Sequence, residues 1–153
     1  MIDDLYTARV LSLAANLPHA GRLAQADASA TRTAKLCGST ITVDVAMREG
    51  LVVDFAQEVK ACALGQAAAG VLGAHVLGAS VEELEAARDG LRAMLTEGAE
   101  PPGGRFVDLA VLRIVREYPA RHASTMLAFE AAADAARRAA DAALQHDAGG
   151  ADS

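Results

Sequence analysis

Apolar and polar residues alternate with a period of two in the second quarter of the chain. From Ile41 to Met47 every second residue is apolar, which is typical of a half-buried strand. Glu49-Gly50 supplies a turn, and the apolar positions resume at every second residue from Leu51 to Phe55. The pattern therefore predicts an antiparallel hairpin.

Most of the remaining chain carries the longer period of helices. A first helix around Leu5 to Ala14 ends before Pro18, and residues 21–33 are small and polar, which indicates a loop with at most a short strand. Residues 61–79 contain no charged side chain and predict a buried core helix. Together these elements predict an α+β fold, a small antiparallel sheet of about three strands packed against several helices.

Helix signals dominate the second half. Ser80 and Glu83 form a capping-box pattern, which predicts a helix to about Arg88 that restarts over residues 91–95. A loop at 101–104, a helical stretch at 106–116, an interruption at Pro119 and a long Ala-rich helix from Arg121 to Leu144 follow. We expect one domain over residues 1–146 and a disordered tail over 147–153.

Composition narrows the class of protein. The 153 residues carry 14 basic and 20 acidic side chains, and the net charge of −6 argues against non-specific nucleic-acid binding. The N-terminus is acidic and unlike a signal peptide, and the uncharged stretch at 61–79 is too rich in Ala and Gly for a membrane span. We expect a cytoplasmic protein, with no membrane and no nucleic acid among its partners, in a compartment that keeps thiols reduced.

Cys37 and Cys62 are the two thiols of the chain. Cys62 stands where a helix begins, two residues after Lys60, and both the helix terminus and the lysine favour a thiolate. Cys37 lies in a glycine-containing turn with Lys35 nearby. Two other interpretations remain open: both cysteines are small buried apolar residues, or they form a redox disulfide, which requires their Cα atoms within about 7 Å.

Several short motifs occur in an order and at spacings that resemble a known family. They are Leu17-Pro18-His19-Ala20-Gly21, Cys37-Gly38, Ala61-Cys62-Ala63, Arg121-His122-Ala123-Ser124-Thr125 and Leu127-Ala128-Phe129. With the hairpin and the order of helices, the chain resembles the iron–sulfur cluster assembly scaffold family, the NifU N-terminal/IscU-like group. The long spacing after Cys62 resembles its SufU-type branch.

The resemblance implies a small α+β domain whose exposed end carries three cysteines and one aspartate. Such domains assemble a labile Fe–S cluster, or hold zinc while they accept persulfide sulfur from a cysteine desulfurase. By position, Cys37 and Cys62 match the first two cysteines, Ser39 replaces the aspartate and Ser124 replaces the third cysteine. The resemblance thus implies iron or an Fe–S cluster as cofactor, zinc as a second choice, and a cysteine desulfurase with other assembly proteins as partners.

Serine changes the expected chemistry, because its hydroxyl is a neutral and weak metal donor. Tight zinc binding by Cys37, Ser39, Cys62 and Ser124 alone is therefore not expected. Two alternatives stay open: a persulfide acceptor that uses one thiol, and a cluster completed by another subunit or a small thiol. His122 is a candidate replacement ligand. On a regular helix it would point about 200° away from Ser124, and a solvated histidine near a helix start is the alternative.

Two hypotheses for function follow. The first is a scaffold-like protein of iron–sulfur cluster assembly, in which Cys37 and Cys62 are ligands or persulfide carriers rather than residues of a conventional enzyme. The second is a diverged interaction module that keeps the fold and binds assembly partners without metal. His75 is expected to be a hydrogen-bonded core histidine in either case.

Overall fold

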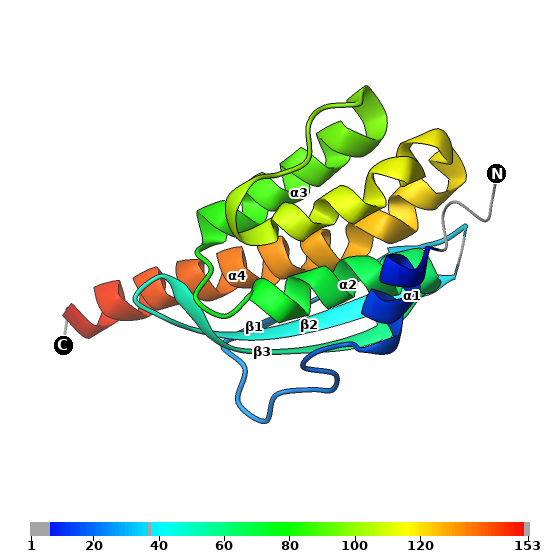
Figure 1. Cartoon of the computed structure of the whole chain (residues 1–153). Helices are drawn as coiled ribbons and strands as arrows, with labels where there is room; N and C mark the ends of the chain where they lie inside the picture. The colour runs from blue at the N-terminus through cyan, green and yellow to red at the C-terminus, as the bar shows by residue number, and fades with distance from the viewer. Residues whose placement is uncertain (1–6, 37, 152–153) are drawn as a thin grey trace.

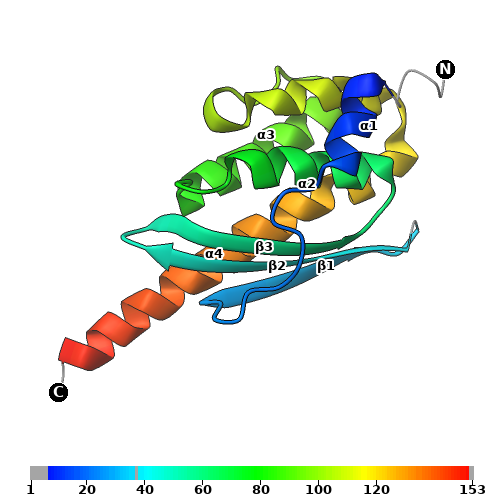
Figure 2. The same cartoon turned by 60° about the horizontal axis from the view of Figure 1, so that its bottom comes forward.

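A three-stranded antiparallel sheet lies at the centre of the computed structural model, which describes residues 7–36 and 38–151. Its strands are β1 (Ala28–Ala34), β2 (Ser39–Arg48) and β3 (Leu51–Lys60), in the order β1-β2-β3. The helices stack in layers on one face of this sheet (Figures 1 and 2). The predicted α+β class is confirmed.

The hairpin of β2 and β3 is as predicted. Its turn is Glu49-Gly50, whose φ angles of 55° and 78° are both positive, as a two-residue type I′ turn requires. Ile41, Val43 and Val45 are fully buried beneath the helices. Burial of one face fixes the register, because a slip of one residue would turn this apolar set to the opposite face.

Strand β1 occupies part of the segment that was predicted as a loop with at most a short strand. It is seven residues long and pairs with β2 from Ala28 opposite Val45 to Ala34 opposite Ser39. The sequence signal is weak because β1 contains no large apolar residue. The ladder of backbone hydrogen bonds to β2 forms the strand in spite of that.

Two helices cover the sheet and the others cover those two (Figure 1). The inner pair is α2 (Ala63–His75) and α4 (His122–Ala151). The outer elements are α1 (Ala8–Ala15), α3 (Val81–Glu97), the 3₁₀ helix η2 (Gly104–Glu117) and the short η3 (Pro119–Arg121). No helix in the described part of the chain is both long enough and apolar enough to cross a bilayer.

Helix α3 begins with the predicted capping box, in which Ser80 and Glu83 exchange hydrogen bonds of 3.1 Å. The predicted restart after Arg88 is wrong, because the helix continues through Gly90 to Glu97. A Cβ at Gly90 would lie 3.0 Å from a ring carbon of Pro102, so the glycine lets the following loop pack closely on the helix. Packing thus offsets the low helix propensity of glycine.

The chain's C-terminal helix is longer than the pattern indicated. Helix α4 begins at His122, close to the predicted start, and its backbone continues to Ala151, past the expected end at Leu144. The division into a domain of residues 1–146 and a tail of 147–153 stays a prediction.

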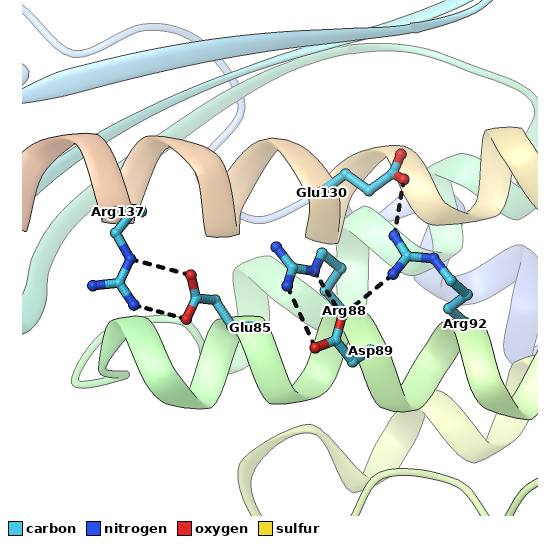
Figure 3. Close-up of polar contacts among 6 residues, drawn as sticks. All are labelled: Glu85, Arg88, Asp89, Arg92, Glu130 and Arg137. Carbon is cyan, nitrogen blue, oxygen red and sulfur yellow. Dashed lines mark hydrogen bonds and ion pairs between the residues drawn. The ribbon is translucent and has the colours of Figure 1, made fainter.

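Ion pairs link α3 to α4 along their exposed sides (Figure 3). Arg137 of α4 donates to Glu85 of α3 at 2.8 Å, and Arg92 of α3 donates to Glu130 of α4 at 3.4 Å. Within α3, Asp89 accepts from Arg92 at 3.3 Å. Exposed pairs of this kind contribute little individually, so their main effect here is to set how the two helices align.

A buried carboxylate holds the N-terminal loop across the sheet face opposite the helices. Asp44 of β2 is 1% exposed and accepts two hydrogen bonds from Arg22, at 2.7 and 3.0 Å, and one from the Leu23 amide at 3.0 Å. The Ser29 hydroxyl donates to it as well. Burial alone would raise the pKa of Asp44, but these donors outweigh it and hold the pKa below its usual value.

We predict that Asp44→Ala lowers the free energy of unfolding at pH 7 by about 1.5–3 kcal/mol, because it removes a charged acceptor from several donors at once. A carboxyl with a lowered folded-state pKa stabilises the fold above its unfolded value near pH 3.9, and this contribution disappears as the pH falls through the folded-state pKa. The gap between wild type and variant should therefore narrow toward pH 3 in urea unfolding. Asp54→Asn, an exposed carboxyl on β3, is the control and should change little. An equal loss at every pH would contradict the assignment.

Candidate functional site

The strand register gathers three segments at one end of the sheet. Ala34 pairs with Ser39 where β1 turns into β2, and Thr40 pairs with Lys60 where β3 ends. The end of β1 and the start of β2 therefore lie at the same end of the sheet as the exit from β3, on the right of Figure 1. Cys37 itself lies outside the described residues, so its distance from Cys62, and with it the disulfide hypothesis, stays a prediction.

Cys62 is the N-cap residue of α2. Its backbone is extended, with φ −66° and ψ 171°, and its carbonyl accepts the first helical hydrogen bond from Gln66 at 2.9 Å. The first turn of α2 holds no acidic side chain. The partial positive charge of the helix start is therefore not neutralised by a neighbouring carboxylate of that turn, and it acts on the thiol.

Close packing of α2 on α4 brings a serine to this thiol. A Cβ at Gly65 would lie 3.0 Å from the Ser124 carbonyl oxygen and 2.8 Å from the Ala61 Cβ, so a side chain there would force neighbouring atoms to shift. Ser124 is fully buried, and its Oγ lies 3.3 Å from the Arg121 carbonyl oxygen and 3.5 Å from the Sγ of Cys62. Its single hydroxyl proton can point to the carbonyl when Cys62 is a neutral thiol and to the sulfur when Cys62 is a thiolate. Two of the residues singled out from the sequence therefore meet.

The surroundings of Cys62 favour its ionised form. Partial burial opposes ionisation, but the hydrogen bond with Ser124, the backbone amides of Gly65 and Leu64 and the charge of Arg121 together outweigh burial, and the pKa of the Cys62 thiol is lowered. A thiolate is the form that attacks sulfur and binds metal. The site is thus suited to nucleophilic or ligating chemistry at Cys62.

Ser39 and His122 have different surroundings. Ser39 opens β2 at the same end of the sheet and is 2% exposed. His122 is the first residue of α4, and its Nε2 lies 3.0 Å from the Val115 carbonyl and 3.2 Å from that of Arg116. Because both neighbours are acceptors, Nε2 carries the proton and donates to the carbonyls at the C-terminal end of η2. Only Nδ1 remains available to a ligand.

Metal-ligand chemistry elsewhere is sparse. Within residues 7–36 and 38–151 no group of three or more His, Cys, Asp or Glu side chains is arranged to hold a metal ion. His75 is hydrogen-bonded as expected, with its Nε2 3.1 Å from Asp108, but its side chain is 39% exposed and so is not a core residue. His75 is the last residue of α2 and lies at the surface. The apolar pattern of the helix did not predict this exposure, because it does not show where the helix leaves the core.

Two residues of the site carried little signal in the sequence. Gly65 is one of several glycines in an Ala/Gly-rich helix, and only its contact with α4 distinguishes it. Arg121 precedes Ser124 by less than one helical turn. If Ser124 faces Cys62, this spacing places the charge of Arg121 near the same thiol.

These features define an α+β domain with an ionisable thiol at the junction between a strand and the following helix. The chain matches the family model described as the NifU-like N terminal domain over residues 5–125. It therefore belongs to the NifU-like N-terminal domain family, and the resemblance drawn from the sequence is confirmed. No curated protein matches the chain.

Solved structures agree with this membership. A nitrogen-fixing NifU-like protein (N-terminal) from Brucella abortus is 52% identical, with a TM-score of 0.89, over 92% of this chain and 97% of that one. A protein designated an iron–sulfur cluster assembly scaffold for the SUF system, from thermophilic Fervidobacterium islandicum AW-1, is 19% identical, with a TM-score of 0.79, over 86% and 96%. At that identity it shows a shared fold. A hypothetical protein is 26% identical, with a TM-score of 0.77, over 88% and 98%.

We predict that Ser124→Ala raises the pKa of Cys62, because it removes a hydrogen bond to the thiolate. A bond of about 1 kcal/mol corresponds to roughly a fivefold smaller thiolate fraction below the pKa. The alkylation rate of Cys62 with iodoacetamide, followed by mass spectrometry in a Cys37→Ser background, should fall by that factor at pH 7, and its midpoint should move to higher pH.

Thr125→Val is the matched control for this measurement. Thr125 is buried beside Ser124 and donates to the same Arg121 carbonyl, at 2.7 Å, one position further along α4. Its loss should leave the alkylation profile in place. A profile that does not respond to Ser124→Ala, or that responds equally to both variants, would show that the serine does not act on the thiol.

Proposed function

We propose that this protein takes part in iron–sulfur cluster assembly by accepting sulfur from a cysteine desulfurase at Cys62. The observation that carries the proposal is the lowered pKa of a partly exposed thiol at the start of α2, beside Ser124. Membership of the NifU-like family supports it, as does the scaffold designation of the Fervidobacterium relative.

The transfer needs no external oxidant. The Cys62 thiolate attacks the outer sulfur of a protonated persulfide on the desulfurase cysteine, the sulfur–sulfur bond of the donor breaks, and the donor cysteine leaves as a thiolate. The proton stays on the transferred sulfur, and Cys62 becomes the persulfide. The helix amides and Arg121 stabilise negative charge on the sulfur of Cys62 before the attack.

Iron, zinc or a cluster would be cargo held with Cys37. Among the described residues near the thiol, Cys62 supplies one soft anionic ligand and Ser124 a neutral hydroxyl, so firm coordination requires Cys37 from the adjoining turn and ligands from outside the domain. The position of the 35–38 turn at this end of the sheet favours such a shared site. Cys37 is then the second sulfur ligand.

Sulfur transfer is directly testable. The purified protein, incubated anaerobically with a cysteine desulfurase of the same organism and ³⁵S-cysteine, should gain one reductant-labile sulfur atom on Cys62, observed by mass spectrometry of the intact chain. Cys62→Ala should abolish the label, and Cys37→Ala should keep most of it. Iron, zinc and acid-labile sulfide are measured on the same samples.

Three results would decide against this function. Label that persists in Cys62→Ala would place the acceptor elsewhere. Label that is lost only in Cys37→Ala would exchange the roles of the two thiols. A wild-type protein that gains neither sulfur nor metal would favour the other hypothesis, an interaction module that keeps the fold.

The serine positions test the metal role separately. We predict that Ser124→Cys combined with Ser39→Asp raises zinc affinity at pH 7 by well over tenfold, because each change restores an anionic ligand of the family pattern. Competition with a chromophoric chelator measures the affinity. Thr125→Cys is the matched control: it adds a thiol about 100° further round α4 and should give no gain. Equal affinities for all three proteins would mean that the serines do not line a metal site.

A further inference from the structure

Most basic side chains of this acidic protein are neutralised by carboxylates. All but two of its arginines form an ion pair within the described residues, and three pairs in Figure 3 illustrate the pattern. The complete set of paired arginines is Arg9, Arg22, Arg32, Arg48, Arg88, Arg92, Arg105, Arg113, Arg137 and Arg138. Of the two exceptions, Arg116 packs against Gly98.

Apart from Arg116, the cations without such a pair lie at the thiol end. Arg121 is the other exception, and it acts on Cys62. Lys35 and Lys60 are the two lysines of the chain, each two residues before a cysteine. Both are exposed, and neither forms an ion pair with a carboxylate in the described part of the chain. A protein with a net charge of −6 therefore presents three such cations on the surface around its reactive sulfur.

An apolar side chain stands inside this surface. Leu36 follows Lys35 in the turn between β1 and β2, and its 92% exposure is the highest among the large apolar residues described. The turn holds it beyond the end of the sheet, away from the core beneath the helices. A single exposed leucine is ordinary on a protein surface, but between a lysine and a thiol it can serve as the apolar anchor of a contact.

We infer that Lys35, Leu36, Lys60 and Arg121 form the docking surface for the sulfur donor, and that the donor presents an acidic rim around its own reactive sulfur with an apolar recess for Leu36. This inference rests on the proposed function, because it names the partner that reaches Cys62. The net negative charge of the protein disfavours other approaches of an acidic partner, whereas these three cations attract it at this end. Attraction at one end and repulsion elsewhere orient the encounter so that sulfur meets sulfur.

The test separates docking from chemistry. Lys35→Glu/Lys60→Glu is compared with wild type in sulfur transfer from a cysteine desulfurase of the same organism, over a range of desulfurase concentrations and of salt. At low salt the kcat/KM of the variant should be about tenfold or more below that of wild type, through a higher KM with kcat nearly unchanged. The kcat/KM of the variant should also depend less on salt than that of wild type does. Iodoacetamide alkylation of each protein corrects for any change in the thiolate fraction.

The matched control reverses the same amount of charge elsewhere. Arg48 ends β2 and Arg138 donates a hydrogen bond to the Ser29 carbonyl near the start of β1, both at the opposite end of the sheet, with side chains 72% and 61% exposed. Arg48→Glu/Arg138→Glu should keep kcat/KM within about twofold of wild type. A decrease equal to that of the lysine variant would assign the effect to net charge and overturn the docking surface.

Binding measured without transfer keeps the two proposals apart. In a Cys62→Ala background, calorimetry with the desulfurase should show weaker binding for Lys35→Glu/Lys60→Glu. Leu36→Ser should also weaken binding, but the affinity should depend on salt as it does in the Cys62→Ala parent. Binding that ignores these changes overturns the docking surface, whether or not sulfur is transferred. Binding that responds to them, with no transfer to wild type, upholds the docking surface and refutes sulfur acceptance at Cys62.

Discussion

The close approach of α2 to α4 is the constraint on which the site depends. Gly65 leaves no space for a side chain between the first turn of α2 and the Ser124 carbonyl. Because Cys62 precedes Gly65 at the start of the same helix, this contact sets the thiol against the first turn of α4, where its Sγ lies 3.5 Å from the hydroxyl of Ser124. The sheet also contributes, because the pairing of Thr40 with Lys60 fixes the position of the end of β3, two residues before Cys62.

Local patterns were sufficient for the elements that depend on local forces. Alternation from Ile41 to Met47 predicted β2 because one face of that strand is buried along its length. The capping box at Ser80 predicted the start of α3 because both of its hydrogen bonds lie within one helical turn. The sequence also placed Cys62 correctly at a helix start, which is why the lowered pKa of its thiol could be anticipated.

Features that depend on contacts between distant segments were not predictable in this way. Strand β1 forms through its ladder to β2, and α3 continues through Gly90 because Pro102 packs there. The meeting of Cys62 with Ser124 followed only from the family resemblance, since no local rule relates residues so far apart. His122 closing the end of η2, and Arg121 acting on the thiol, likewise required the tertiary structure.

Serine at position 124 changes what the thiol can do without a metal. A second thiolate 3.5 Å from Cys62 would repel it, so a pair of cysteines could ionise together only when a cation neutralised them. A hydroxyl in the same place donates a hydrogen bond and lowers the pKa of Cys62. Under the proposed function, serine in place of the family's third cysteine would remove a ligand, and it would let Cys62 ionise without a bound cation. Such a site would bind metal less tightly, and Cys62 would still act as a nucleophile toward sulfur.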